Sequence, residues 1–363
     1  MKGSMEAKME WEKNVRKVVP YTPGEQPKEK DIIKLNTNEC PYPPAPGVSR
    51  LLEQMDYEDF RLYPSPSADS LVNALAEYYH LDASQVFVGV GSDDVIAQAF
   101  LTFFNSEKPI LFPDITYSFY DVWAELYRIP YERQPLDENF RIRKEDYLKD
   151  NGGIIFPNPN APTGVLEDLS MIEEIVSYNK DRVVMIDEAY IDFGGQSALE
   201  LIGKYDNLLV IQTFSKSRAM AGMRIGYAMG QPKLIRYLND VKFSVNSYTM
   251  NRPSLILGVE AVRDDDYFRR IVGMIISTRE WMKKELSGLG FSFPDSRSNF
   301  IFATHEKYPA KELFEYLKTK KIYVRYFAQP RIDNYLRITV GTDDEAKALI
   351  DALKTYINED IDA

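Results

Sequence analysis

The sequence predicts an α/β fold with one large domain, built on a mostly parallel sheet flanked by helices, and one smaller α+β domain. Short apolar runs alternate with segments of helical periodicity along much of the chain. This pattern changes after about residue 255, and 363 residues are enough for two hydrophobic cores. We therefore expect an N-terminal arm at 1–40, a large domain at 41–255 and a small C-terminal domain at 256–363.

The first part of the chain is expected to combine two helices with two stiff segments. Residues 11–19 have the spacing of an amphipathic helix, which Pro20 would end. The segment 40–47 is so rich in proline that we expect an extended arm or a loop lining a site, and 57–66 is similar. Helical spacing resumes at 69–79, where the regular part of the fold begins.

Apolar runs and helical periodicity then predict the remaining elements in order. In the large domain we expect helices at 91–104 and 169–176 and strands at 86–90, 110–112, 153–156, 182–186 and 208–212. In the small domain we expect helices at 268–289, 310–320 and 345–356 and strands at 299–302, 322–325 and 335–340. Strands that alternate with helices form a mostly parallel sheet, and open α/β sheets build their sites at its carboxyl edge.

Composition argues against several classes of partner. The net charge is -11 and the pI is near 5.0, with no clustered basic stripe, so we expect no nucleic-acid surface. No apolar run reaches the roughly 18 residues that span a bilayer, and the first residues lack a signal-peptide core. The single cysteine, Cys40, cannot form an internal disulfide, so we expect a reducing compartment, the cytoplasm. His80 and His305 lie far apart without metal-ligand spacing, so we expect no metal site.

The main chemical signal is the stretch around Lys216, just past an expected strand. The lysine stands among the hydroxyls of Thr213, Ser215 and Ser217, and Arg224 follows it. A lysine amine can form a Schiff base with an aldehyde cofactor, while hydroxyls and an arginine donate hydrogen bonds to a phosphate on the same cofactor. Taken alone, the stretch also fits a solvated lysine in a serine-rich turn.

Other polar groups also follow expected strands. Asp187 could hold a protonated ring nitrogen in a dry site and make a pyridine ring an electron sink, although it also fits a helix N-cap. Gly91 and Ser92 open an expected helix, where free amides bind anions. Asn160 lies in a rigid turn that could aim an amide at a ring oxygen or a substrate carboxylate, although purely structural turns with this composition are common. Tyr117 could stack on the ring or belong to the core.

Three arginines near the C-terminus, Arg325, Arg331 and Arg337, lie in or beside short expected strands. An arginine within an apolar strand is seldom left unpaired, so we expect each to have a carboxylate or phosphate partner. That partner is either an acidic side chain of the protein or an anionic group of a substrate. The sequence alone leaves both possibilities open.

Together these motifs resemble those of a known family over nearly the whole chain. The chain contains Asn-Ala-Pro-Thr-Gly at 160–164, Asp-Glu-Ala-Tyr at 187–190, Ser-Lys at 215–216 and Arg224. This order of motifs resembles that of the fold-type I aminotransferases, which depend on pyridoxal 5'-phosphate (PLP). Within that group the chain is most similar to the histidinol-phosphate aminotransferases. This similarity rests on Pro20-Tyr-Thr-Pro-Gly-Glu-Gln, Leu35-Asn-Thr-Asn-Glu, Tyr63-Pro and Leu336-Arg-Ile-Thr-Val-Gly-Thr.

The resemblance implies a role for each candidate residue. Lys216 would form the imine and shuttle a proton, Asp187 would pair with the ring nitrogen, and Tyr190 would donate to the ring oxygen. The other cofactor contacts would be Gly91, Ser92, Asp93, Tyr117, Asn160, Thr213, Ser215 and Arg224. Substrate contacts would be Tyr21, Asn38, Arg325, Arg337 and, reaching across from the partner subunit of a homodimer, Tyr63.

One position departs from the pattern of the family. Many relatives have an asparagine immediately before Pro-Thr-Gly, where it hydrogen-bonds the ring oxygen, but this chain has Ala161. A methyl group cannot donate a hydrogen bond. Either Asn160 or Tyr190 therefore takes over this contact, or the electronic properties of the cofactor differ.

The implied reaction is the ping-pong conversion of L-histidinol phosphate and 2-oxoglutarate to imidazole-acetol phosphate and L-glutamate, a step of histidine biosynthesis. An aromatic amino-acid aminotransferase or a phospho-amino-acid decarboxylase would share the cofactor machinery. From another class, a nicotinamide dehydrogenase could use Gly89-Val-Gly91, but this turn lacks the third glycine of a dinucleotide fingerprint. The retained Lys216 and Asp187 argue against a catalytically silent binding protein.

Overall fold

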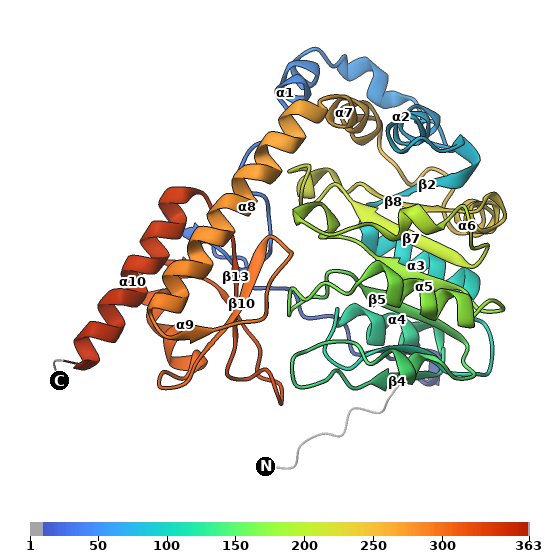
Figure 1. The fold of residues 1–363 in the computed structure, drawn as a ribbon. Helices are drawn as coiled ribbons and strands as arrows, with labels where there is room; N and C mark the ends of the chain where they lie inside the picture. Colours follow the sequence, from blue (N-terminus) through green and yellow to red (C-terminus); the bar gives the residue numbers. More distant parts are fainter. Residues whose placement is uncertain (1–9, 362–363) are drawn as a thin grey trace.

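A seven-stranded sheet lies at the centre of the structure, a computed structural model that describes residues 10–361. Its strands are β2 (Val86–Gly89), β3 (Ile110–Pro113), β4 (Tyr131–Gln134), β5 (Gly153–Pro157), β6 (Val184–Asp187), β7 (Leu208–Thr213) and β8 (Gly226–Gly230). They lie in the order β2-β8-β7-β6-β5-β3-β4; β3 to β7 are parallel, and β8 is antiparallel to both neighbours. This arrangement confirms the predicted α/β fold with a mostly parallel sheet (Figure 1).

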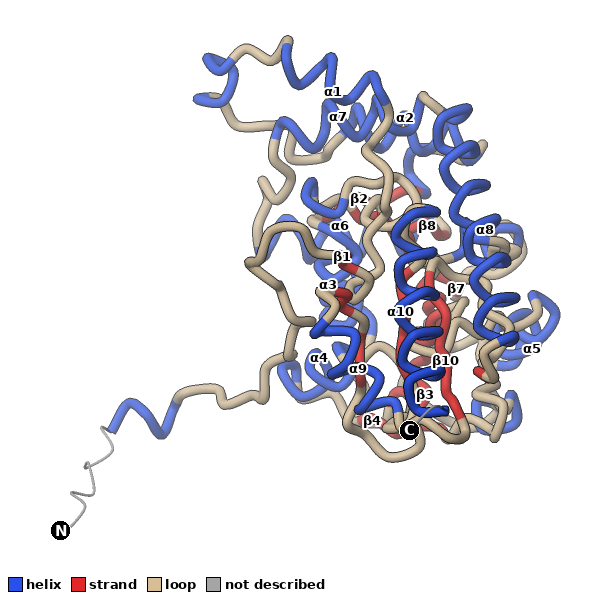
Figure 2. The backbone as a smooth tube through the Cα atoms, turned by 90° about the vertical axis from the view of Figure 1, so that its left-hand side faces the viewer, coloured by secondary structure: helices blue, strands red, loops and turns tan. Residues whose placement is uncertain are grey.

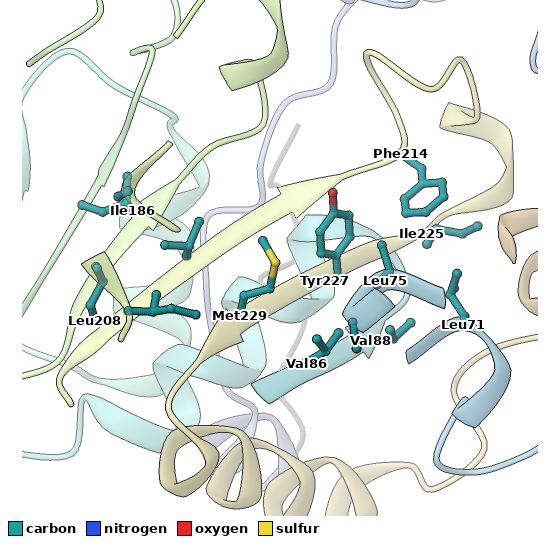
Figure 3. Packing of buried hydrophobic residues seen from close by; sticks show 14 of the residues in the cluster. Leu71, Leu75, Val86, Val88, Ile186, Leu208, Phe214, Ile225, Tyr227 and Met229 are labelled. Atoms are coloured by element: carbon teal, nitrogen blue, oxygen red, sulfur yellow. The ribbon is translucent and has the colours of Figure 1, made fainter. Parts of the chain in front are cut away.

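Helices cover both faces of this sheet because most of its strands are buried and apolar on both sides. They are α1 (Pro46–Glu53), α2 (Asp69–Tyr79), α3 (Gly91–Phe103), α4 (Phe119–Tyr127), α5 (Leu169–Tyr178), α6 (Pro232–Val245) and α7 (Arg252–Arg263). Along β7, Leu208 faces a core cluster with α2, α5 and α7, whereas Leu209 faces a second cluster with α3, α4 and α6. Figure 3 shows Leu71 and Leu75 of α2 in the first cluster.

The C-terminal part has its own α+β core. Its elements are α8 (Asp265–Gly288), β9 (Phe291–Ser292), β10 (Phe300–His305), α9 (Ala310–Thr319), β11 (Ile322–Tyr323), β12 (Arg325–Tyr326), β13 (Leu336–Thr339) and α10 (Asp343–Ile361). An antiparallel sheet in the order β12-β13-β10-β9 packs against α8, α9 and α10 (Figure 2). The short strand β1 (Ile33–Lys34) pairs in parallel with β11, which ties the N-terminal segment to this part.

Short 3-10 turns connect the longer elements. They are Glu10–Asn14, Tyr57–Arg61, Ala83–Gln85, Lys144–Tyr147, Ile191–Phe193, Ala198–Leu201 and Ala221–Met223. Within the described part of the chain, no helix is long and apolar enough to cross a membrane.

Three predictions for the N-terminal part are wrong in detail. Only Glu10–Asn14 forms a helical turn, and 15–19 has no regular structure, because none of the turn's residues is buried and a short helix is unstable without packing. Helix α1 begins at Pro46, inside the segment expected to be extended, because proline fits the first turn of a helix. Within 57–66, expected to resemble the extended segment 40–47, Tyr57–Arg61 forms a 3-10 turn in which the Asp56 side chain caps the amide of Glu58. The predicted domain boundaries at residues 40 and 255 stay predictions.

Candidate active site

A cavity of about 820 Å³ opens at the carboxyl edge of the central sheet. Most of the predicted site residues line it: Tyr21, Asn38, Ser92, Asp93, Tyr117, Asp187, Tyr190, Thr213, Ser215, Lys216, Arg224, Arg325 and Arg337. Asp187 is the last residue of β6 and Thr213 is the last residue of β7, and these strands are parallel neighbours. The fold therefore brings the two segments with the main predicted chemistry to one place, as expected for an open α/β sheet.

Lys216 lies in the turn that follows β7 and is half-buried in the cavity wall. Its Nζ donates a hydrogen bond to the carbonyl oxygen of Thr37 at 3.2 Å and lies 5.8 Å from the centre of the Tyr190 ring. Among the described residues no carboxylate forms an ion pair with this amine. The amine is therefore not held by a counter-ion, as a Schiff-base lysine requires.

A cradle for an anion lies at the start of α3. Gly91 has φ +83, and a Cβ there would lie 2.4 Å from Nη2 of Arg224. A Cβ on Gly226 of β8 would lie 2.2 Å from the amide nitrogen of Ser92. Only glycine fits this close approach, which leaves the first amides of α3 and the guanidinium of Arg224 beside one another. Gly91 itself does not line the cavity, whereas Ser92 does.

Asp93, predicted to contact the cofactor, is engaged with other side chains. Its Oδ1 accepts a hydrogen bond from the Tyr117 hydroxyl at 2.8 Å, and its Oδ2 forms an ion pair with Arg224 at 3.3 Å. Burial, and then the charge of Asp93, raise the pKa of Tyr117, so that its hydroxyl stays protonated and donates. Asp93 therefore orients both Tyr117 and Arg224.

Asp187 is almost fully buried, with 5% of its surface exposed. Its Oδ2 accepts a hydrogen bond from the Tyr120 hydroxyl at 2.9 Å, and its Oδ1 accepts one from the amide of Ala189 at 3.2 Å. Burial raises the pKa of Asp187 to about 6, against the opposing effect of Tyr120. The following 3-10 turn is capped by Tyr190, so the N-cap alternative for Asp187 is wrong. A fixed carboxylate at this wall suits a cation in the cavity, such as a protonated pyridine nitrogen.

Tyrosines complete the wall around Lys216. The hydroxyl of Tyr190 accepts a hydrogen bond from Nδ2 of Asn38 at 2.9 Å, which joins two of the predicted residues. Tyr21 stacks on Phe119 with ring centres 4.2 Å apart. These contacts fix the positions of two aromatic side chains that line the cavity.

Arg325 and Arg337 occupy paired positions on the antiparallel strands β12 and β13, and both line the cavity. Nη2 of Arg337 donates to the carbonyl oxygen of Asn36 at 2.9 Å, but its buried Nε has no hydrogen-bond partner within residues 10–361. Burial lowers the pKa of Arg337, and the neighbouring charge of Arg325 acts in the same direction. Arg331, by contrast, already pairs with Asp114 at 2.8 Å. Two adjacent guanidinium groups that no described carboxylate pairs with indicate an anionic ligand.

Besides Gly91, two predicted residues do not line the cavity. Nδ2 of Asn160 donates to a backbone carbonyl at 2.9 Å and to a threonine hydroxyl at 3.1 Å, so its amide holds the surrounding loops together. Tyr63 is 78% exposed and stacks on Tyr248, with ring centres 4.5 Å apart. Cofactor contact by Asn160 and substrate contact by Tyr63 stay predictions. Of the two groups expected to compensate for Ala161, only Tyr190 lines the cavity.

Sequence reasoning missed Tyr120, Phe119 and Thr37. Tyr120 and Phe119 lie on α4, which the sequence analysis did not predict. The spacing of three residues between Tyr117 and Tyr120 is the one signal that could have placed their side chains together. Thr37 contributes a backbone carbonyl, which leaves no signal in the sequence. No group of three His, Cys, Asp or Glu side chains that could hold a metal occurs within residues 10–361.

The set of donors and acceptors in the cavity fits PLP. An amine without a counter-ion, a buried carboxylate and an anion cradle line one cavity, together with Tyr117 and Tyr190. The glycines at the cradle support this fit. Side chains at Gly91 and Gly226 would displace the guanidinium of Arg224 and the amide of Ser92, the two groups that would bind a phosphate. An aldehyde, a pyridine nitrogen and a phosphate on one molecule match these three groups.

Comparison with known sequences agrees with a PLP site in this cavity. Residues 30–353 match the sequence model of the family described as aminotransferase class I and II. A protein of Lactococcus lactis subsp. lactis named histidinol-phosphate aminotransferase is 50% identical over 356 residues, which cover 98% of this chain and 99% of that protein. A Clostridium botulinum (strain Kyoto) protein of the same name is 49% identical over 349 residues, or 96% of this chain and 99% of that protein.

Solved structures share the fold. The histidinol-phosphate aminotransferase of Sinorhizobium meliloti, in complex with PLP, superposes with a TM-score of 0.83 at 22% identity and covers 90% of this chain and 91% of that one. The enzyme of the same name from Clostridium acetobutylicum also has a TM-score of 0.83 at 22% identity, covering 90% of this chain and all of that one (100%). The chain belongs to the PLP-dependent class I and II aminotransferases, and within them to the histidinol-phosphate aminotransferase family.

Proposed function

We propose that this chain converts L-histidinol phosphate and 2-oxoglutarate to imidazole-acetol phosphate and L-glutamate, as a step of histidine biosynthesis. The observation that supports this most is the pair Arg325 and Arg337, which faces the cavity of Lys216 and pairs with no carboxylate among the described residues. The phosphate of the amino donor and a carboxylate of the amino acceptor are anions that these guanidinium groups can bind in turn. Relatives 50% and 49% identical carry the name of this activity.

Each residue of the proposed site has a defined role. Nζ of Lys216 takes the proton from the α-carbon of the amino donor, and in the second half of the cycle it delivers a proton to the α-carbon of the amino acid formed from 2-oxoglutarate, which is general acid–base catalysis. The carboxylate of Asp187 keeps the ring nitrogen protonated. The Ser92 amide and Arg224 bind the cofactor phosphate. When bound, PLP supplies an electron sink for the carbanion at the α-carbon.

Aromatic side chains orient the reactants in this proposal. Tyr117 stacks on the cofactor ring, and the hydroxyl of Tyr190 contacts the ring oxygen where the family often has an asparagine. Tyr21, backed by Phe119 at 4.2 Å, contacts the substrate phosphate and keeps water from the reacting carbon. The other residues of 19–24 also line the cavity.

A substrate panel on PLP-loaded protein tests the reaction. We expect turnover of L-histidinol phosphate with 2-oxoglutarate, and a kcat/KM at least about tenfold above that for phenylalanine, because the phosphate adds charge-assisted hydrogen bonds. Absence of turnover on histidinol phosphate would end the substrate assignment. Release of carbon dioxide from threonine phosphate would instead identify a phospho-amino-acid decarboxylase.

Arg337→Lys is expected to lower kcat/KM for the phosphorylated donor by about 10²-fold, mainly through KM. Lysine keeps the charge but loses the planar fork that binds an anion through two hydrogen bonds. Arg331→Lys is the matched control, because Arg331 already pairs with Asp114. We expect this control to stay within about twofold of the wild type in steady-state assays. Equal losses of kcat/KM in both variants would contradict the proposal that Arg325 and Arg337 bind the substrate.

We also propose a homodimer in which Tyr63 enters the cavity of the partner subunit. Tyr63 is exposed together with Tyr57, Phe60 and Leu62, beside the exposed ring of Tyr248. A contiguous apolar patch of this kind marks a protein interface. Sedimentation equilibrium should give twice the chain mass of 41.9 kDa, and a monomer would contradict the proposal.

Mixing two inactive chains tests the shared cavity directly. Tyr63→Ala and Lys216→Ala chains, refolded together, should regain about a quarter of the wild-type activity, because one cavity of each mixed dimer has both residues. Each variant refolded alone is the control. No gain on mixing would place Tyr63 outside the partner's site.

A further inference from the structure

The two residues after Lys216 point away from the cavity, into the buried interior. Ser217 is 1% exposed, and its Oγ donates a hydrogen bond to Oδ2 of Asp192. Arg218 is 5% exposed, and its Nη1 donates to the carbonyl oxygen of Ala261 on α7 at 2.7 Å. The expectation that Ser217 donates to a cofactor phosphate is thus wrong, because its hydroxyl is engaged on the other side of the turn.

Arg218 lies in a cage of aromatic rings. Its guanidinium carbon is 4.2 Å from the centre of Phe268, 4.9 Å from that of Tyr78 and 5.5 Å from that of Phe214. Its Nη2 is buried and has no hydrogen-bond partner among the described residues. The ring faces, the carbonyl oxygen of Ala261 and the charge of Asp192 together stabilise this buried cation.

Asp192 interacts with both Ser217 and Arg218. Burial raises the pKa of Asp192, whereas the hydrogen bond from Ser217 and the charge of Arg218 oppose that rise. Both opposing groups belong to the residues that directly follow Lys216. The carboxyl group of Asp192 and the turn after Lys216 therefore hold each other in place.

The turn itself has a conformation that needs such support. Ala219 has φ 57, in the left-handed region that residues with a Cβ seldom occupy. Within the turn, the amide of Ala219 donates to the carbonyl of Lys216 at 3.3 Å, and the amide of Met220 donates to that of Phe214 at 3.0 Å. Strained residues persist where the surrounding contacts fix them, and they gather at functional sites.

We propose that Ser217, Asp192 and Arg218 are positioning residues that hold the turn 214–220 so that Nζ of Lys216 points into the cavity. None of the three lines the cavity, so they act through Lys216 and touch neither substrate nor cofactor. This inference rests on the proposed role of Lys216. It matters for rate because a displacement of a reacting group by about 1 Å can cost a factor of about 10².

Kinetics of the PLP-loaded enzyme test the proposal first. Ser217→Ala should lower kcat about 10- to 100-fold and leave the KM of the amino donor within about twofold, because Arg325 and Arg337 lie on other strands. Ser217→Thr keeps the hydroxyl and should recover kcat to within about threefold of the wild type. A raised KM with unchanged kcat would overturn the proposal.

Hydrogen exchange in the cofactor-free protein gives a readout independent of activity. In Ser217→Ala, the amides of Ala219 and Met220 should exchange at least about tenfold faster than in the wild type, because the anchor of the turn is lost. Amides of the neighbouring strand β7 should keep their protection. Unchanged exchange in the turn would show that Ser217 does not hold it.

Ser197→Ala is the control matched in chemistry. The Ser197 hydroxyl also donates to a buried carboxylate, that of Glu188, at 2.6 Å, but it does not adjoin Lys216. We expect it to lose a similar amount of thermal stability while kcat stays within about twofold. An equal loss of kcat in Ser197→Ala and Ser217→Ala would overturn the proposal, because both losses would then reflect general destabilisation of the protein. Failure of the Lys216 assignment is detected separately, because borohydride would then fix PLP to another lysine.

Discussion

Lys216→Ala is expected to abolish transamination, with a fall in kcat of at least about 10⁴-fold. The variant lacks the amine that we propose to hold the cofactor covalently and to move the proton at the α-carbon. No other lysine of the described residues lines the cavity, so none can replace it. Steady-state assays with the preferred amino donor measure the loss.

Lys216→Arg is the matched control for this change. Arginine keeps the positive charge and much of the length but has no amine that condenses with an aldehyde at neutral pH, so we expect the same loss. In the wild type, borohydride reduction followed by peptide mapping should find the cofactor on Lys216. Reduced cofactor on a different lysine would end the assignment of this residue and the mechanism built on it.

The meeting of Lys216 with Asp187 could be predicted because each follows a short apolar run. Such runs form buried parallel strands, and β6 and β7 are neighbours with Asp187 paired to Ile211. Polar residues at the ends of neighbouring parallel strands share one edge of the sheet. Strand type and chain order were therefore enough to predict that these side chains share one site.

Strand β8 could not be predicted in the same way. Gly226, Ala228 and Gly230 have low strand propensity, and the strand forms because β2 and β7 bond to it from both sides. The glycine at 226 is required by the approach of the Ser92 amide, which only the folded structure brings near. The glycine at this position of β8 is therefore explained by a tertiary contact and not by the strand propensity of the residue. The same applies to α4, α6 and α7, whose packing against the sheet outweighs weak local signals.

The partners of the site residues were the least predictable part. The guanidinium of Arg337 bonds the carbonyl of Asn36, and Asp187 accepts its hydrogen bond from Tyr120, across long stretches of sequence. A backbone carbonyl has no residue type that marks it, and 24 tyrosines give no reason to choose Tyr120. Sequence patterns therefore predict the groups that react better than the groups that orient them.

Asp187→Asn is expected to lower kcat about 10²- to 10³-fold while the protein stays folded. Asparagine keeps the shape and can still accept the hydrogen bond from Tyr120, but it lacks the charge that we propose to keep the ring nitrogen protonated. Glu188→Gln is the control, because this neighbouring buried carboxylate faces Ser197 and Gln212 and not the cavity. We expect the control to retain kcat within about threefold. Equal losses of kcat in both variants would mean that the loss reflects removal of a buried charge in general and not a specific role of Asp187.

The pH dependence of PLP binding separates charge from shape at this position. Burial raises the pKa of Asp187 from 3.8 to about 6 in the cofactor-free protein. Below that pH the carboxyl must lose its proton before it pairs with the ring nitrogen, so PLP affinity should fall about tenfold per pH unit. Between 3.8 and about 6 the folded state also holds a proton that the unfolded chain has lost, so Asp187 should add stability as the pH falls. Asp187→Asn should remove both slopes, and slopes that persist in the variant would belong to another group.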